Sequence, residues 1–398
     1  MIARFCAYSV LKNLRFADPF LVLFLLHLGL SMAAIGSLLG GQHLLTGVLE
    51  VPLGAVADRW GRRRSLALGF LCYLASFALF ASVSEVDWAR LVMATGLFGL
   101  GEALRSGSHK AIILDYLEQR SESERAAEVI GLTRSFSKAT SGSAALAGGF
   151  ILYASGSYTW LFALSAVAAA GGFALMLSYP RSLEGEQSRA GKAMGSARAL
   201  VREPGVVPLV VQSTLFESQV KILLKYYLAP FLQVALAAVG LSVMAWGAVA
   251  IGAVEMLRDG LGSVASRQAV RLRTAAGGAA SALRIAYLGA VLAAAALTWA
   301  AGRDALWLGV PAAVALSVLQ NARRPVFVSA FDDVLDKPQR ATSLSIESLA
   351  RTVVVAALLP LVGSVADRVG LWAAFAALLS VLALGLLIPL GTGHRDHT

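Results

Sequence analysis

Ionisable side chains stand inside long apolar stretches of this chain. In the stretch 89–117, Glu102, Arg105 and His109 are spaced to share one face of a helix. A charge near the middle of a bilayer costs about 3 kcal/mol on insertion scales, so such groups normally face a cavity, a partner charge or both. Acids and bases in this setting suit two kinds of chemistry, namely binding of a charged small molecule and transfer of protons.

The bases near the middle of the apolar stretches outnumber the acids. The arginine fork matches a carboxylate or phosphate in a bidentate way, and arginine keeps its proton. We therefore expect an anionic or zwitterionic substrate, because a purely cationic compound would be repelled. The predicted substrate-binding residues are Arg105, His109, Lys138, Lys221, Arg323 and Arg324.

Proton coupling requires an acid whose charge changes when its surroundings change. Glu102, next to Arg105, fits this requirement best, and His109 has an ordinary pKa near neutral pH. Acids and bases that only neutralise each other are the structural alternative, and both Arg15 with Asp18 and Glu347 with Arg351 have helical spacing. The predicted proton-coupling residues are Glu102, Asp18, Glu50 and Glu217.

The apolar stretches themselves predict an all-α polytopic membrane protein. Hydrophobic residues make up 57% of the 398 residues, charged residues only 15%, and the mean hydropathy is +0.70, which excludes a soluble globular protein. Each stretch is long enough to cross a bilayer as a helix, and none alternates as a barrel strand does. Twelve helices are predicted, near 7–33, 40–57, 65–84, 89–117, 126–153, 158–180, 205–235, 239–265, 281–301, 304–334, 341–366 and 370–390.

The chain reads as two related halves. A polar stretch rich in Gly, Ser, Glu and Lys predicts a cytoplasmic linker at 181–204, between six-helix bundles at 1–180 and 205–398. Three sequence matches support an internal repeat at an offset of 211 residues: Pro19-Phe20 with Pro230-Phe231, Gly29-Leu30-Ser31 with Gly240-Leu241-Ser242, and Gly36 with Gly247. Parallel repeats with a site between them near the midplane are one architecture of secondary transporters.

The net charge of +10 lies mostly in alternate connections, which argues against a nucleic-acid partner. With both termini in the cytoplasm, the basic residues gather on the inside, as the positive-inside rule requires. No small-residue cleavage site follows the first apolar stretch, so we expect a retained helix and not a signal peptide. Cys6 and Cys72 both lie in apolar stretches and offer neither a disulfide framework nor a metal cluster.

A basic turn, Gly54 to Arg64, separates the second and third apolar stretches. It matches Gly-x-x-x-Asp-Arg-x-Gly-Arg-Arg at every defining position and so resembles the signature of the major facilitator superfamily. Gly54 would let two helices approach closely, and Gly61 would supply a tight turn. Related sequences follow the eighth stretch, at Gly262–Arg267 without the Asp, and the eleventh, at Gly363–Gly370 on the outer side.

The resemblance implies twelve transmembrane helices in two pseudo-twofold-related six-helix bundles. It also implies that the turn latches the outward-open state through a charge relay of Asp58, Arg62 and Asp115. Asp58 is placed to accept hydrogen bonds at a helix N-terminus. The predicted gating residues are Gly54, Asp58, Arg59, Gly61, Arg62 and Asp115. The alternative, which we prefer for Arg63 and Arg64, is that the arginines only fix the orientation of the chain in the membrane.

The sequence Gly101–Gly107, followed by Asp115-Tyr116, and Glu50-Val51-Pro52 are similar to bacterial efflux-type facilitators. This similarity implies proton-driven export of a small amphiphile or metabolite across the bacterial inner membrane by a monomer without cofactors. Phosphate-binding-loop and His-Glu-x-x-His motifs are absent, so we expect neither ATP use nor an enzyme. Two alternatives stay open: uptake of an organic anion or flipping of an anionic lipid, and a receptor or scaffold that no longer transports.

Overall fold

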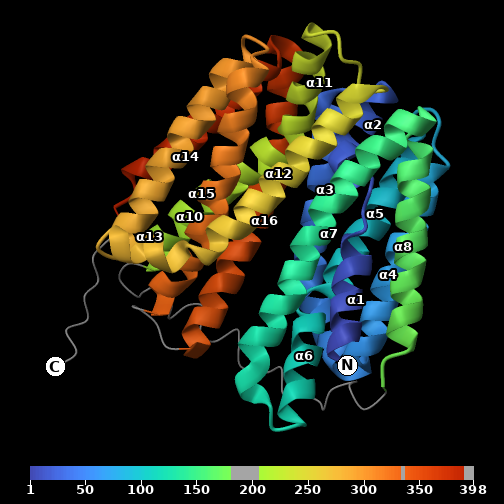
Figure 1. Ribbon diagram of the computed structural model, residues 1–398, viewed down its shortest axis with the longest axis vertical. Coiled ribbons are helices and arrows are strands. Elements are labelled where there is room, and N and C mark those ends of the chain that lie inside the picture. Colours follow the sequence, from blue (N-terminus) through green and yellow to red (C-terminus); the bar gives the residue numbers. More distant parts are fainter. Residues whose placement is uncertain (181–205, 333–336, 390–398) are drawn as a thin grey trace. The chain divides into compact units, whose positions relative to one another are not determined.

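The computed structural model describes residues 1–180, 206–332 and 337–389 (Figure 1). All regular secondary structure in these ranges is helical, which confirms the all-α prediction. The predicted linker at 181–204 lies almost wholly outside the described residues, so its role stays a prediction.

The chain forms two compact units. Unit 1 comprises the described parts of Met1–Leu30, Ser37–Arg189 and Leu241–Met256, and unit 2 those of Ser31–Gly36, Ala190–Gly240 and Leu257–Thr398. Two short stretches are therefore exchanged relative to the predicted halves. Ser31–Gly36, from the predicted first half, belongs to unit 2, and Leu241–Met256, from the predicted second half, belongs to unit 1. The repeat offset of 211 places Ser31–Gly36 at 242–247, inside the other exchanged stretch.

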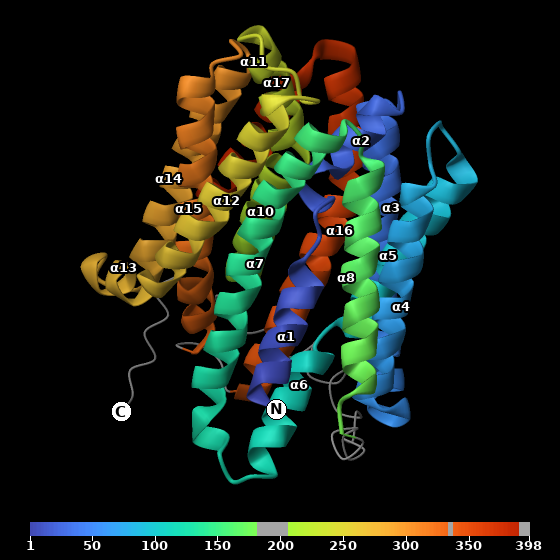
Figure 2. The ribbon, with the colours of Figure 1, turned by 45° about the vertical axis from the view of Figure 1, so that its right-hand side comes forward.

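Unit 1 is a bundle of helices, several of which lie side by side in Figure 2. Helix α4 packs against α5 and α8, and α1 packs against α7 and α8. The helices are α1 (Ile2–Asn13), α2 (Leu21–His27), α3 (Met32–Trp60), α4 (Arg62–Ala81), α5 (Trp88–Arg105), α6 (Ser108–Glu118), α7 (Ala126–Ser155) and α8 (Thr159–Leu177).

Unit 2 is also built from helices. Helix α14 packs against α15 and α17, and α10 packs against α16. The helices are α10 (Val206–Ile222), the π-helical turn η4 (Leu223–Tyr227), α11 (Leu228–Ala238), α13 (Ala269–Ala275), α14 (Ala279–Ala301), α15 (Leu306–Asp332), α16 (Lys337–Val369) and α17 (Leu371–Leu384), followed by η5 (Gly385–Leu387). Helix α12 (Trp246–Arg267) is divided, with its part up to Met256 in unit 1 and the rest in unit 2.

Six of the described helical segments are long and apolar enough, by length and composition, to cross a membrane. Many large apolar side chains on the helices are exposed, such as Val167 at 67% and Leu292 at 62%, as expected of surfaces that contact lipid. Three predicted spans, the first, fourth and seventh, consist of consecutive helical pieces. The predicted twelve-span pattern is consistent with this arrangement.

The first predicted span, 7–33, is not one helix. Helix α1 ends at Asn13, and α2 begins only at Leu21 after a short 3₁₀ turn at Asp18–Phe20. Pro19 explains the interruption, because proline has no backbone N–H and disfavours helical geometry in the residue before it. The break places Arg15 in non-helical backbone.

The fourth predicted span, 89–117, is also interrupted, so the prediction of one continuous helix is wrong. Helix α5 ends at Arg105, Ser106 has extended backbone (ψ 127°), and Gly107 has φ 70°. A left-handed residue ends a helix, and glycine adopts it without a steric cost. His109 therefore lies on α6 and does not share a helix face with Glu102 and Arg105.

Candidate functional site

A charged cluster in unit 1 is centred on Glu102 of α5. Its carboxylate accepts hydrogen bonds from Arg15 Nη2 at 2.8 Å and from Arg105 Nη2 at 2.7 Å. The Tyr73 hydroxyl donates to the same carboxylate at 2.8 Å. The predicted pairing of Glu102 with Arg105 is thus present. Sequence spacing missed Tyr73, which comes from α4.

Arg15 completes this cluster from the break after α1. Its guanidinium carbon lies 4.6 Å from the centroid of the Tyr73 ring and 4.8 Å from that of Phe98. Asp18, the partner suggested by spacing, lies 3.9 Å away and is partly exposed, so Glu102 is the closer partner of Arg15. Both arginines thus contact the single carboxylate of Glu102, and Asp18 lies at the edge of the cluster.

His109 lies in an aromatic cluster on α6, one turn below the break. Its ring stacks on Tyr8 with a centroid distance of 3.6 Å and contacts Phe5 edge-on at 5.7 Å. Its Nε2 lies 3.5 Å from the Tyr179 hydroxyl. These contacts pack the imidazole between rings of α1 and the Tyr179 hydroxyl after α8, so a structural role explains them as well as substrate binding does.

Two further predicted residues of unit 1 are located near the same helices. Glu50 of α3 accepts a hydrogen bond from the Ser106 hydroxyl, so this predicted proton carrier is tied to the break between α5 and α6. Lys138 is half-buried on α7. Its neighbour Ser137 accepts a hydrogen bond from Asn13 at 2.5 Å, which joins α7 to the end of α1.

A second charged cluster occupies unit 2. Arg323 of α15 is completely buried, with Nη1 3.8 Å from Glu217 Oε1, and Gln320 donates to Glu217 Oε2 at 2.9 Å. The Arg323 guanidinium lies over the Phe216 ring, 4.3 Å from its centroid. Within the described part of the chain, Nε and Nη2 of Arg323 have no hydrogen-bond partner. A buried cation with so few partners is costly and marks a functional candidate.

Glu347 of α16 joins this cluster and was not among the predicted site residues. It is fully buried and accepts from Arg324 Nη1 at 3.0 Å and from the Ser213 hydroxyl at 3.3 Å. Arg351 lies 3.8 Å away. The helical spacing of Glu347 and Arg351 was visible in the sequence. The contact between Glu347 and Arg324 joins two helices, so it could not be predicted from the spacing.

The six predicted substrate-binding residues divide equally between the units. Arg105, His109 and Lys138 belong to unit 1, whereas Lys221, Arg323 and Arg324 belong to unit 2. Within the units, Arg105 and Arg324 each bind one acid closely, and Arg323 lies near another. Lys221 is half-buried on α10, one turn after Glu217. Their binding roles remain predictions.

The signature turn has the predicted charge relay. Arg62 donates from Nε to Asp58 Oδ1 at 3.0 Å and from Nη1 to Asp115 Oδ2 at 2.6 Å, while Arg59 is exposed. Gly61 ends α3 with φ 107°, as expected of a tight turn. The close helix approach expected at Gly54 is not seen, because a Cβ there would meet no described atom within 4 Å.

We expect Asp58→Asn to shift the protein toward inward-facing states by about tenfold while leaving its expression intact, since it removes a charged acceptor of Arg62. The measurement is thiol labelling of single-cysteine variants from each side of the membrane. Glu122→Gln serves as the control, because Glu122 is an acid of the α6–α7 connection whose ion pair with Arg125 is partly exposed. An unchanged labelling ratio would count against the gating role.

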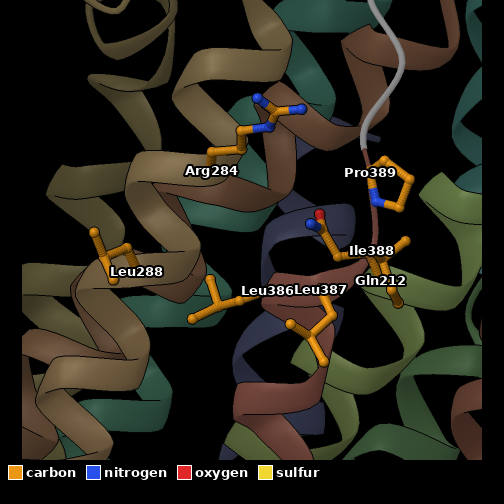
Figure 3. Close-up of a pocket in the computed structure, with 7 residues that line it drawn as sticks. All are labelled: Gln212, Arg284, Leu288, Leu386, Leu387, Ile388 and Pro389. Atoms are coloured by element: carbon orange, nitrogen blue, oxygen red, sulfur yellow. The ribbon is translucent and has the colours of Figure 1, made fainter.

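A surface pocket of about 250 Å³ lies elsewhere in unit 2 (Figure 3). It is lined by Gln212 of α10, Arg284 and Leu288 of α14, and residues 386–389 at the end of η5. The Gln212 amide is buried, and its Nε2 lies 3.5 Å from the Gly385 carbonyl oxygen. Because none of the predicted site residues lines this pocket, the charged clusters remain the candidate site.

Comparison with solved structures shows what this fold is similar to. A variant of the nucleoside transporter NupG superposes with a TM-score of 0.82 at 12% identity, covering 97% of this chain and 98% of that chain. A D-xylose-proton symporter gives 0.71 at 14% identity and 98% coverage of both chains. A bacterial homologue of the human lysosomal transporter Spinster gives 0.65 at 19% identity, covering 97% of this chain and 91% of that chain.

Sequence comparison gives the family directly. No curated protein sequence matched the chain. The profile of the Major Facilitator Superfamily matches residues 1–356, which is most of the chain and includes the signature turn. This match and the shared fold show that the chain belongs to the major facilitator superfamily and is a multi-pass membrane transporter, not an enzyme.

Proposed function

We propose that this chain is a proton-coupled secondary active transporter of small anionic or zwitterionic compounds, working by alternating access in the bacterial cytoplasmic membrane. It would act as a monomer with both termini in the cytoplasm, and the proton gradient would be its energy source, with no cofactor. The observation that carries this proposal is the pairing of Arg15 and Arg105 with the single carboxylate of Glu102.

The geometry links anion binding to protonation. Arg15 and Arg105 both donate hydrogen bonds to Glu102, so an anionic group would compete with that carboxylate for the two cations. Protonating Glu102 removes its charge and weakens both contacts, because the Coulomb attraction between each guanidinium and the carboxylate is lost. A proton and an anion therefore favour each other's binding. Cooperative binding moves both in the same direction, which is proton-driven uptake.

Unit 2 has a similar arrangement. Glu347 is bound by Arg324 and lies near Arg351, and Glu217 lies near Arg323. Displacement of Glu347 by a substrate carboxylate or phosphate would again leave an acid without its cation. In a buried site such an acid takes up a proton more readily. This similarity supports an anionic substrate group, as does the presence of more arginine than glutamate in both clusters.

Export in exchange for protons is the second candidate, and the similarity of Gly101–Gly107 to efflux-type facilitators favours it. A substrate with an ammonium group, as in a zwitterion or a cationic amphiphile, would bind Glu102 in place of Arg15. Such a substrate competes with a proton for the same carboxylate, and competition gives exchange. Symport with protons would therefore indicate that the arginines recognise an anionic group of the substrate, and exchange with protons would indicate that Glu102 recognises a cationic group.

The test is transport by purified protein in proteoliposomes. Counterflow with a panel of organic anions, zwitterions and anionic lipids first identifies a substrate. For a substrate moving with one proton, a pH gradient of one unit, acid outside, should then drive about tenfold accumulation inside. Depletion under the same gradient would support export by exchange. Absence of counterflow for every compound would contradict transport of this panel and favour a receptor or scaffold.

A further inference from the structure

The signature turn has a close copy elsewhere in the chain. Gly54-Ala-Val-Ala-Asp-Arg-Trp-Gly61 and Gly363-Ser-Val-Ala-Asp-Arg-Val-Gly370 are identical at six of eight positions. Both copies end a long helix, α3 in the first case and α16 in the second. Their last glycines have almost the same backbone, with φ 107° at Gly61 and 110° at Gly370. The second copy is therefore the same structural device, and neither charged cluster includes it.

The acid of the second copy caps a helix. Asp367 Oδ1 accepts a hydrogen bond from the backbone N–H of Met32, and Oδ2 accepts one from Ala33, both at 2.8 Å. The Ser31 hydroxyl accepts from the N–H of Ala34 at 3.2 Å. The first N–H groups of a helix have no partner within the helix, and its N-terminus attracts negative charge. Asp367 supplies both the acceptors and the charge.

Glycines allow the backbones to approach closely enough for this cap. A Cβ on Gly363 would collide with the Met32 carbonyl oxygen, and one on Gly36 would collide with the Leu359 carbonyl oxygen. Neither obstacle is a flexible side chain, so α3 and α16 would have to separate to admit a methyl group. All four residues belong to unit 2, as does Asp367.

We propose that Asp367 is a positioning residue for alternating access, whose carboxylate caps α3 in one state of the transport cycle and releases it in the other. Only the first turn of α3 belongs to unit 2, and the rest of this helix belongs to unit 1. Movement of α3 relative to α16 must break two charge-assisted hydrogen bonds, which makes the contact a two-state element. The proposal rests on alternating access but on no particular substrate or coupling ion.

The two copies differ in what their acids bind. Asp367 binds a helix N-terminus, whereas Asp58 binds the side chain of Arg62. The two acids also act at opposite ends of α3. Asp367 caps the start of this helix, and Asp58 lies near its end. We therefore expect substitutions of Asp58 and Asp367 to change the populations of the two states in opposite directions.

The experiment measures the distance distribution between a spin label on unit 1 and one on unit 2, each at the start of a helix that, by the predicted topology, begins on the same side of the membrane as α3. Labels at Trp160→Cys and Trp307→Cys, both exposed, would be placed on protein lacking Cys6 and Cys72. Asp367→Asn and Asp367→Ala should raise the ratio of the long-distance to the short-distance population about tenfold. Asp58→Asn should lower this ratio, and Glu85→Gln, which changes an exposed loop acid, should leave it unchanged.

A second variant tests the same contact without changing charge. Gly363→Ala should also raise the long-distance population, whereas Gly260→Ala, in a helix where a Cβ meets nothing within 4 Å, should not. Distance distributions that match the wild type in Asp367→Ala and in Gly363→Ala would overturn the proposal. Because the distance measurement requires no substrate, it tests the role of Asp367 independently of the transport assay.

Discussion

Glu102→Gln is expected to abolish accumulation driven by a pH gradient while preserving counterflow. Glutamine keeps the size and acceptor oxygen of Glu102, so Arg15 and Tyr73 retain a hydrogen-bond partner. Glutamine has no charge and no acidic proton, so protonation can no longer weaken the contacts between this side chain and the arginines. For one coupled proton, the roughly tenfold accumulation per pH unit should fall to simple equilibration.

The measurement is paired transport in proteoliposomes, with counterflow and gradient-driven uptake assayed on the same preparation. Glu85→Gln is the control, since it makes the same chemical change at an exposed position of the α4–α5 loop. Arg105→Ala is a contrasting variant that should lose both activities while remaining folded, because it removes a cation that would bind the substrate. If Glu102→Gln retained gradient-driven uptake, another acid would have to couple transport to protons, and Glu217 and Glu347 would be tested next.

Glu217→Leu is expected to destabilise unit 2 strongly, and adding Arg323→Met is expected to restore its stability. Arg323 is fully buried, and Glu217 is its nearest acid. Removing one partner of a buried ion pair leaves an uncompensated charge and costs about 3 kcal/mol or more. That loss corresponds to a fall of roughly 10 °C in Tm for a unit of this size. Replacing both partners with apolar residues removes the charge altogether.

A double-mutant cycle measured by thermal unfolding in detergent would test this prediction. Asp304→Asn is the matched control in unit 2, because Asp304 is exposed and asparagine tolerates its positive φ of 50°. A double variant as unstable as Glu217→Leu alone would show that Arg323 is not the source of the loss. If the buried arginine serves transport, the stable double variant should be inactive.

Local spacing was sufficient to predict part of the candidate site. Glu102 and Arg105 lie three residues apart on α5, and this pair is present in the structure. Asp58 and Arg62, which lie on either side of the turn at Gly61, were paired from the family resemblance. The relay to Asp115 came from the family resemblance. The pairing of Arg15 with Glu102 had no local signal, because these residues are 87 positions apart and meet only through the packing of the bundle.

The helical fold was predictable because apolar length is a strong signal, whereas the interruptions were not. In the run 89–117, apolar residues lie on both sides of the polar stretch 105–110, and a single glycine is tolerated within a helix, so the sequence did not reveal that Gly107 is the left-handed residue that ends α5. The same limit applies to the π-helical turn at Leu223–Tyr227, which continues the helix with altered hydrogen bonding. These breaks matter for function, because they decide that His109 and Glu102 lie on different helices.

The cap on α3 also has a consequence for the order in which the protein is completed during synthesis. Met32 and Ala33 are separated from Asp367 by 335 and 334 residues. At about 5–20 residues per second, roughly 20–70 s pass between synthesis of the start of α3 and synthesis of its acid. The early helices of unit 1 must therefore insert with these two N–H groups bound to water. Unit 1 likewise waits for Leu241–Met256, so it cannot reach its final contacts until the chain has passed through the first part of unit 2.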